Sequence, residues 1–330
     1  MKRVGIVCAG RGSYTERSLG SLPSGHAWVE RADALRAEYG LLALSHLDAA
    51  GRFSQATHLR PANVAPLIWL VTLLDAAEAR REARCVAVAG NSMGWYSALA
   101  VAGALDFDDG FRLVQEMALL QEESAGGGQM IQPVVGEDWR PDPAARRAVD
   151  EALATSDGHA FPSIELGGYV VLAGDDEGLA HLARSLPRVQ FGKNAYPFKL
   201  VQHGPYHTPL CEGVAARARE RLGGLAWRAP EVPLVDGRGV RWTPWSCDTA
   251  ALRDYTLGRQ VVAPYDFTHS VRVLLREHGP DELVLPGPGN SLGGVCGQIL
   301  VAERWRGVSS RAEFEALQAG PEPVVRSMRR

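Results

Sequence analysis

The sequence predicts a mixed α/β fold, and three stretches carry that prediction. Residues 4–8 are a short apolar run that stops at Gly10, as a buried strand does where it opens into a loop. Residues 85–89 are a second apolar run, followed by a glycine-flanked turn and by residues 95–104, which are rich in Ala, Leu and Val. Strand, sharp turn and helix in this order form the repeating unit of α/β domains.

Two further helices are predicted from the spacing of apolar side chains. In residues 62–84 these side chains recur at close to 3.6 positions, which indicates an amphipathic or buried helix. Residues 109–123 also have a helical pattern, with Phe111 and Val114 on one side. This stretch ends in the glycine-rich segment 124–128, the strongest helix breaker in the chain and the first candidate for a domain boundary.

Beyond the breaker, the pattern predicts a β-α-β-α-β run of the size of a small inserted subdomain. After His207 the chain returns to mixed α/β structure. The strands expected in the run are 130–135, 169–174 and 189–200, and its helices are 143–155 and 175–186. The later elements are helices 208–222 and 267–278 and strands 232–235 and 282–285.

Composition and charge exclude several classes of function. Among 330 residues, 35 Lys and Arg against 38 Asp and Glu leave a net charge of −3, so we expect no nucleic acid or anionic membrane as a partner. The apolar runs are too short or interrupted to cross a bilayer, and the N-terminus lacks the apolar core of a signal peptide. The five cysteines are widely spaced, which favours neither disulfides nor a metal site. We expect a cytoplasmic protein.

Residues 90–94, Gly-Asn-Ser-Met-Gly, match the pattern of a nucleophile elbow around Ser92. In such a turn a serine hydroxyl projects from the end of a strand, small neighbours let the backbone approach, and the next N–H helps to form an oxyanion hole. An ordinary glycine-rich loop is the alternative, and the flanking strand and helix favour the elbow.

A serine hydroxyl needs a base to become a nucleophile. Of the nine histidines, His203 and His207 lie in an irregular stretch of the kind that carries functional sites. Histidines in such stretches also serve as surface or hydrogen-bonded structural residues. The pattern alone therefore leaves the choice between His203 and His207 open.

The chain resembles the malonyl-CoA:acyl carrier protein transacylases and the related acyltransferases of fatty acid and polyketide synthesis. Residues 9–13 resemble the family's PGQGS loop, and residues 89–99 its AGHSLGEYSAL segment. Further motifs follow in the family's order at 102–109, 112–114, 170–174, 204–207 and 287–289.

The resemblance implies a two-step acyl transfer. Ser92 would attack the thioester of an acyl-CoA with His207 as general base, and the phosphopantetheine thiol of an acyl carrier protein would then take the acyl group. The backbone carbonyl of Gln260 would orient His207, and the N–H groups of Met93 and Arg11 would form the oxyanion hole. No metal or permanently bound cofactor is implied.

The fold expected with this family is a large α/β-hydrolase-like domain, residues 1–128 and 201–330, with a small ferredoxin-like subdomain inserted at 129–200. The active site would lie in the cleft between them. Tyr206, which precedes the proposed base, is placed among the substrate-binding residues.

Several departures from the family's pattern concern the substrate. Met117 stands where malonyl-specific members carry an arginine that pairs with the malonyl carboxylate, which makes an uncharged acyl group plausible. Arg11 replaces a glutamine, and its guanidinium would either bind an acyl carboxylate, bind a CoA phosphate or point to solvent. Asn91 replaces a histidine. Ser163 and Glu165 lie in the stretch where relatives carry two asparagines, and a Glu165 that faced the cleft would repel a malonyl carboxylate or pair with Arg11.

The same residues suit two other functions. An acyl hydrolase that clears carrier proteins would use Ser92 and His207 with water in place of the thiol, and a degenerate docking protein would use neither. Because carrier proteins are acidic, we expect a basic docking rim in the small subdomain. Its candidates are Arg184, Arg188, Lys193 and Lys199. The basic chain end, 326–330, is expected to be frayed and is given no role.

Overall fold

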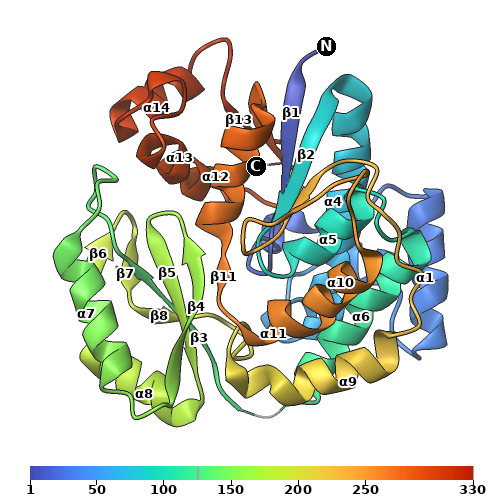
Figure 1. The fold of residues 1–330 in the computed structure, drawn as a ribbon. Coiled ribbons are helices and arrows are strands. Elements are labelled where there is room, and N and C mark those ends of the chain that lie inside the picture. Colours follow the sequence, from blue (N-terminus) through green and yellow to red (C-terminus); the bar gives the residue numbers. More distant parts are fainter. Residues whose placement is uncertain (125, 330) are drawn as a thin grey trace.

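The structure is a computed structural model that describes residues 1–124 and 126–329, and it confirms a mixed α/β fold (Figure 1). Ala125, inside the predicted breaker segment 124–128, and Arg330, in the basic chain end, lie outside the described residues. Two main sheets with helices packed against them make up most of the regular structure.

The larger sheet has six strands, and the two strands predicted from the first glycine loops lie side by side in it. β1 (Arg3–Cys8) pairs in parallel with β2 (Arg84–Gly90), so both strands end at the same edge of the sheet. The loops that carry Arg11 and Ser92 therefore meet there. The strand order is β10 (Arg241–Trp242), β9 (Leu234–Val235), β2, β1, β12 (Glu282–Leu285) and β13 (Val325–Ser327), antiparallel at β10 and otherwise parallel.

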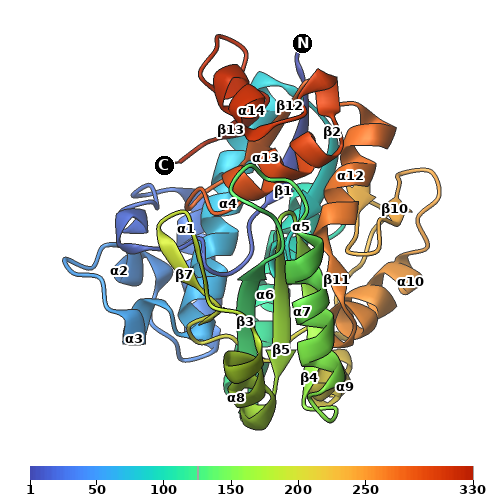
Figure 2. The ribbon, with the colours of Figure 1, turned by 90° about the vertical axis from the view of Figure 1, so that its left-hand side faces the viewer.

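Helices cover both faces of this sheet. Val4 belongs to a buried cluster with Ala79 of α4, whereas a side chain on Gly5 would collide with Leu274 of α12. Successive residues of a strand face opposite sides, so α4 and α12 lie on opposite faces, as Figures 1 and 2 show. The main helices here are α4 (Pro61–Glu82), α5 (Gly94–Val101), α6 (Phe107–Glu122), α9 (Glu212–Leu222), α12 (Phe267–His278) and α13 (Gly293–Ala302).

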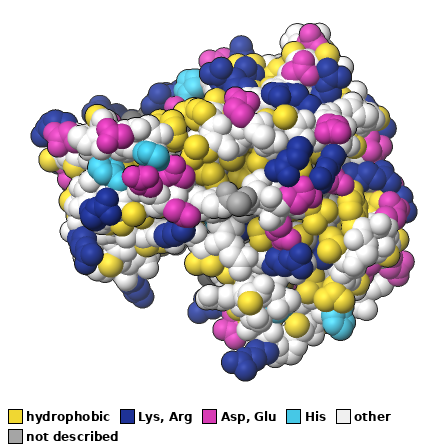
Figure 3. Space-filling view, turned by 90° about the horizontal axis from the view of Figure 1, so that it is seen from below, with side chains coloured by type: hydrophobic (Ala, Val, Ile, Leu, Met, Phe, Trp, Pro, Cys, Tyr) yellow, Lys and Arg dark blue, Asp and Glu magenta, His cyan; other side chains and the backbone are white. Residues whose placement is uncertain are grey.

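The second sheet has five strands and two helices packed against it. In Figure 3, the lobe at the left that holds this sheet is separated from the rest by a hollow. The strand order is β11 (Tyr265–Asp266), β4 (Ala160–Leu166), β5 (Tyr169–Gly174), β3 (Gly128–Pro133) and β8 (Phe198–Lys199), and the helices are α7 (Pro143–Ala154) and α8 (Asp176–Ser185).

Two predictions for this sheet are wrong. The single strand expected at 189–200 is a hairpin, β6 (Val189–Phe191) and β7 (Asn194–Tyr196), followed by the short β8. The run also contains an additional strand, β4. It carries no clear strand signal in the sequence because Pro162 interrupts it, and its pairing with β5 shifts register between Pro162 and Ile164.

The two sheets are tied together by the chain after residue 201. Tyr265 of β11 pairs in parallel with Ile164 of β4, although the sequence assigns residue 265 to the large domain. At the turn between β4 and β5, the N–H of Gly167 donates to Thr268 Oγ1 at 2.8 Å and that of Gly168 donates to Gln298 Oε1 at 2.9 Å. The sheet of the small unit is thus completed by a strand from the other part of the chain.

Several helices lie where no element was expected, and one ends early. α5 stops at Val101, short of the predicted residue 104, because Gly103 takes a left-handed conformation with φ 79°. The helix expected from 208 begins as a short 3-10 turn before α9. The unpredicted helices are α1 (Ala27–Glu38), α2 (Leu44–Asp48), α3 (Gln55–His58), α10 (Thr249–Asp254), α13 and α14 (Arg311–Gln318).

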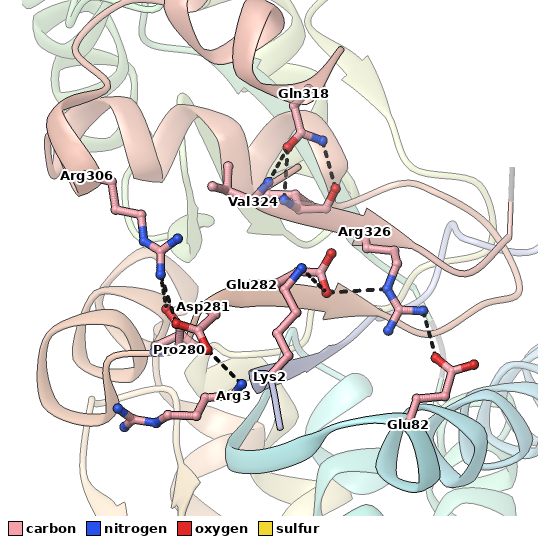
Figure 4. Close-up of polar contacts among 11 residues, drawn as sticks. Lys2, Arg3, Glu82, Pro280, Asp281, Glu282, Arg306, Gln318, Val324 and Arg326 are labelled. Atoms are coloured by element: carbon pink, nitrogen blue, oxygen red, sulfur yellow. Dashed lines mark hydrogen bonds and ion pairs between the residues drawn. The ribbon is translucent and has the colours of Figure 1, made fainter. Parts of the chain in front are cut away.

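The chain end is held in place, which corrects the expectation of a frayed terminus. β13 pairs with β12, and Gln318 Oε1 accepts hydrogen bonds from the N–H groups of Val324 and Val325, both at 2.9 Å. Arg326 forms ion pairs with Glu82 and Glu282 (Figure 4). The last strand is therefore an integral edge of the large sheet.

Within the described residues, one helix is long and apolar enough to span a membrane by length and composition. This is α4, and 83% of its most apolar window is buried inside the protein. Such burial is also what a core helix shows.

Candidate active site

Ser92 lies in a tight turn between β2 and α5, where its backbone φ is 54°. The flanking glycines are required by close backbone contacts. A Cβ on Gly90 would lie 2.2 Å from the backbone of Gly94, and one on Gly94 would lie 2.3 Å from the carbonyl oxygen of Cys8. The sequence therefore folds locally into a strained turn that exposes the serine hydroxyl at the end of the strand.

His207 is the histidine that reaches Ser92. Its Nε2 lies 2.8 Å from Ser92 Oγ, and its Nδ1 lies 2.6 Å from the backbone carbonyl oxygen of Gln260. Because a carbonyl oxygen only accepts, Nδ1 carries the ring proton, and the neutral ring then accepts the serine proton at Nε2. The backbone of His207 is itself strained, with φ 64°.

The end of a short helix makes the carbonyl of Gln260 available. A π-helical turn, Tyr255–Arg259, leads into α11 (Gln260–Val262), which stops at Ala263. Carbonyls in a last helical turn have no partner within the helix. His207 uses two of them, since its own N–H donates to Val261 O at 2.8 Å.

The side chain of Gln260 connects this turn to the serine. Its Nε2 donates to the carbonyl of Ser92 at 3.2 Å, and its Oε1 accepts from the hydroxyl of Tyr96 at 3.1 Å. Base, nucleophile and helix end are thus fastened together.

Burial lowers the pKa of His207 to about 4, partly opposed by its hydrogen bond to the Gln260 carbonyl. The imidazole is therefore neutral at neutral pH, as a general base must be. His203 points elsewhere: its Nδ1 lies 2.8 Å from Gln129 Oε1. Its pKa is also lowered, first by burial and then by the charges of Arg11 and His207.

The two N–H groups expected in the oxyanion hole border the serine. Met93 and Arg11 line the same small cavity as Ser92. Within the described residues, neither backbone N–H donates to a protein acceptor, which leaves both available for an oxyanion.

Two cavities meet at Ser92. The smaller, about 40 Å³, lies against α6 and is bordered by Met117, Tyr206 and His207. The larger, about 440 Å³, opens between the two sheets, and most of its lining is apolar, including Ile131, Leu166 and Leu292. Ser92 can therefore be reached from a wide cleft, with a small pocket beyond it.

Of the remaining four substrate-binding candidates, two border a cavity and two do not. Asn91 borders the larger cavity, and Tyr206 borders the smaller one and donates to the carbonyl of Met117 at 3.2 Å. Ser163 is buried behind the site, where its hydroxyl donates to the carbonyl of Tyr206 at 2.9 Å. Glu165 borders neither cavity.

Glu165, a candidate substrate-binding residue, neither faces the cleft nor pairs with Arg11. Both of its carboxylate oxygens accept hydrogen bonds from Arg146 of α7, each at 2.8 Å. The side chain is held on the helix-covered side of the second sheet because a complete bidentate partner is available there.

Arg11 points into the site and is held by neutral groups. Its Nη1 donates to Gln121 Oε1 and its Nη2 to the carbonyl of Gln202, both at 2.5 Å. Sequence reasoning missed Gln121, Gln129 and Gln202. The available signals were the position of Gln121 one helical turn after Met117 and that of Gln202 beside His203.

The four expected docking residues are exposed, and within residues 1–124 and 126–329 none of them forms an ion pair. Basic and acidic side chains are interspersed on the face seen from below (Figure 3). The same part of the chain holds no group of three or more His, Cys, Asp or Glu suited to a metal ion.

The arrangement defines a class of site: a serine at an elbow, hydrogen-bonded to a neutral histidine, beside an apolar cleft and two backbone N–H groups that have no acceptor within the described residues. Known proteins agree with this class. A malonyl CoA-acyl carrier protein transacylase of Escherichia coli (strain K12) is 29% identical over 309 residues, 91% of this chain and 94% of that protein. A probable mitochondrial malonyl-CoA-acyl carrier protein transacylase of Drosophila melanogaster is 30% identical over 272 residues, 77% of this chain and 67% of that protein.

A solved structure of an acyl-carrier-protein S-malonyltransferase from Burkholderia pseudomallei 1710b has a TM-score of 0.72 at 25% identity, covering 91% of this chain and 93% of that chain. No family model matches the sequence. The chain belongs to the family of the malonyl-CoA:acyl carrier protein transacylases, which confirms the resemblance of its motifs.

Proposed function

We propose that this chain transfers an acyl group from an acyl-CoA to the phosphopantetheine thiol of an acyl carrier protein, through an ester on Ser92. The observation that supports it most directly is the chain of contacts from Ser92 Oγ through His207 to the Gln260 carbonyl, at 2.8 and 2.6 Å. The curated relatives, named for transfer between malonyl-CoA and acyl carrier protein, support the same reaction.

In the first half-reaction, His207 Nε2 takes the proton of Ser92 as Oγ attacks the thioester carbon. The N–H groups of Met93 and Arg11 stabilise the negative oxygen of the tetrahedral intermediate. The C–S bond then breaks, and the CoA sulfur leaves with the proton that His207 returns. In the second half, the carrier thiol attacks the ester by the same steps, and Ser92 recovers its proton. These steps require no resident cofactor.

We also propose a fold type for each of the two parts of the chain. The order β3-α7-β4-β5-α8-β8 in the second sheet supports a ferredoxin-like subdomain within residues 129–200, and the parallel sheet with its serine elbow supports an α/β-hydrolase-like large domain. The proposal also includes a cytoplasmic location and docking of the carrier protein at four basic residues, Arg184, Arg188, Lys193 and Lys199.

The test is intact-protein mass spectrometry after incubation with separate acyl-CoAs, followed by addition of a holo acyl carrier protein. We expect an acyl adduct that moves to the carrier, and Ser92→Ala to form none. Ser185→Ala, which changes an exposed serine of α8, is the matched control and should behave as the unchanged protein.

Two results would contradict the proposal. A Ser92→Ala protein that still becomes acylated would remove the nucleophile. An adduct that releases free acid at the same rate with or without carrier would identify an acyl hydrolase instead of a transferase.

A further inference from the structure

We propose that Arg11 binds a carboxylate on the acyl group, so that the substrate is a short acyl group that ends in a carboxylate, although Met117 occupies the family's arginine position. This inference rests on the proposed function and names the substrate class of the same site. It is carried by the contacts of the guanidinium, by the charges around it and by the size of the pocket.

The guanidinium of Arg11 is incompletely satisfied. Its two bonded partners, Gln121 Oε1 and the Gln202 carbonyl, are neutral, and its buried Nε has no hydrogen-bond partner within the described residues. The side chain borders both cavities that meet at Ser92. Nε is enclosed, but each terminal nitrogen carries two N–H groups and makes one of these hydrogen bonds within the described residues, so N–H groups remain for an anion that enters beside the nucleophile.

A second buried arginine shows what a purely structural one looks like in this protein. Arg36 is completely buried and donates to four acceptors: the carbonyls of Leu42 and Ala62 and the side chains of Asn63 and Gln115. It borders none of the cavities described here. Arg11 has half as many acceptors and lies at the nucleophile, so structural support does not account for it.

The carboxylate nearest in effect to Arg11 already pairs with another arginine. Glu122, the acid whose charge acts on Arg11, binds Arg60 through both oxygens at 2.7 to 3.0 Å and also accepts from the N–H of Ala62. The two histidines of the site are kept neutral by burial. Burial lowers the pKa of Arg11 only to about 10, so its positive charge persists at neutral pH.

The pocket against α6 has room for a short acyl group only. Its volume is about 40 Å³, against about 440 Å³ for the open cleft. Met117 is 3% exposed and closes the α6 side with an apolar wall, so a carboxylate there would be unpaired. Arg11 lies on the wall of the same pocket, where the far end of a malonyl-sized group would find two N–H donors of one guanidinium.

The experiment measures a ratio. The full-length protein is mixed with equal amounts of malonyl-CoA and isovaleryl-CoA, which has two methyl groups in place of the carboxylate oxygens, and the two Ser92 adducts are quantified by intact mass at early times. We expect malonyl to be preferred. In Arg11→Gln the malonyl-to-isovaleryl ratio should fall about tenfold to hundredfold, the range for hydrogen bonds to a charged group.

Matched variants separate the causes. Arg147→Gln removes the same charge from an exposed position on α7 and should leave the ratio unchanged. Arg11→Lys keeps the charge without the planar fork and should give an intermediate ratio. It also serves if Arg11→Gln fails to fold, which a far-UV circular dichroism spectrum would show.

The proposal is overturned if the unchanged protein takes up isovaleryl at least as fast as malonyl, or if Arg11→Gln slows both equally, as loss of a CoA phosphate contact would. Those outcomes leave the acyl transfer itself intact. If the unchanged protein forms no adduct with either thioester, the proposed function fails as well.

Discussion

Ser92 and His207 both have backbone φ angles in the left-handed region, 54° and 64°, which non-glycine residues rarely adopt. Each such angle costs on the order of 1–3 kcal/mol and persists only where the surroundings hold it. The contacts of the Gln260 side chain and of the last carbonyls of α11 provide that hold. The strain thus lies in the two residues whose side chains must meet.

The pH dependence of acylation follows from the buried base. Since burial lowers the pKa of His207 to about 4, the ring stays neutral well below the ordinary histidine value of about 6.5. The rate of Ser92 acylation, kcat/KM for the acyl-CoA, should therefore be level from neutral pH downward and fall only as the pH drops through about 4.

Stopped-flow release of CoA at a series of pH values checks this expectation. The folded state must be verified at each pH, because the unfolded chain takes up the His207 proton first and folding stability decreases between about 6.5 and 4. A fall in rate centred near 6.5 in a folded protein would contradict the neutral, buried base.

At the scale of residues, the sequence predicted the Ser92–His207–Gln260 geometry better than the ion pairs. The spacing around Ser92 and the family resemblance placed Ser92, His207 and the Gln260 carbonyl correctly in space. The orientation of Glu165 was wrong because it depends on Arg146, nineteen positions earlier on another element. No local pattern reports which of several acids and bases meet after folding.

At the scale of elements, the elbow depends on how closely α5 approaches β1. A Cβ on Gly94 would lie 2.3 Å from the Cys8 carbonyl oxygen and 2.8 Å from that of Ala9. Gly94→Ala should therefore push the helix away from the sheet, displace Ser92 and lower the acylation rate by at least about tenfold, with a loss of stability of the size typical for overpacking, about 1–3 kcal/mol.

Gly213→Ala is the matched control, since it lies in α9 with no atom near the added Cβ. It should keep full activity and gain up to about 1 kcal/mol of stability. Urea unfolding and the mass assay measure the two effects. Equal behaviour of the two variants would show that the close approach at Gly94 has no functional importance.

Elements with a regular period were predicted closely. α12 and β12 have the bounds that the sequence predicted, 267–278 and 282–285. β4 and β13 were not found, since Pro162 interrupts the first and the second is a three-residue strand whose pairing with β12 depends on distant contacts such as those of Gln318. A period in the apolar residues shows that one face of an element is buried. Segments that are short or interrupted have too few residues to show such a period.

At the scale of the whole molecule, the two sheets should unfold together. Ile164 of the second sheet belongs to the main buried core, and β11 crosses from the large part of the chain to complete that sheet. Breaking either sheet therefore exposes apolar surface in the other.

Thiol labelling during urea unfolding tests this cooperation. Cys211 is buried in the large part, and Ala152→Cys would place a thiol in the separate core of the second sheet, where residue 152 is 2% exposed. The two thiols should become reactive at the same urea concentration, as peptide mass spectrometry would report. Earlier labelling at position 152 would instead indicate a subdomain that opens by itself.

The overall architecture was accessible to the sequence because the family motifs occur in order along the chain, whereas the crossing of β11 was not. The sequence analysis assigned residues 201–330 to one domain as a block. The pairing of Tyr265 with Ile164 depends on contacts that form only when the chain folds, and no local pattern indicates it.

The acceptor behind His207 is main chain, and this affects how the site tolerates genetic variation. In a triad completed by a carboxylate, one codon change removes the third member. Here a missense change at position 260 alters the amide that fastens the turn but leaves the carbonyl that accepts the hydrogen bond from Nδ1–H. We therefore expect changes that redirect the backbone, such as insertions, deletions and prolines, to be more damaging than side-chain changes, and substitutions at 260 to leave many active proteins.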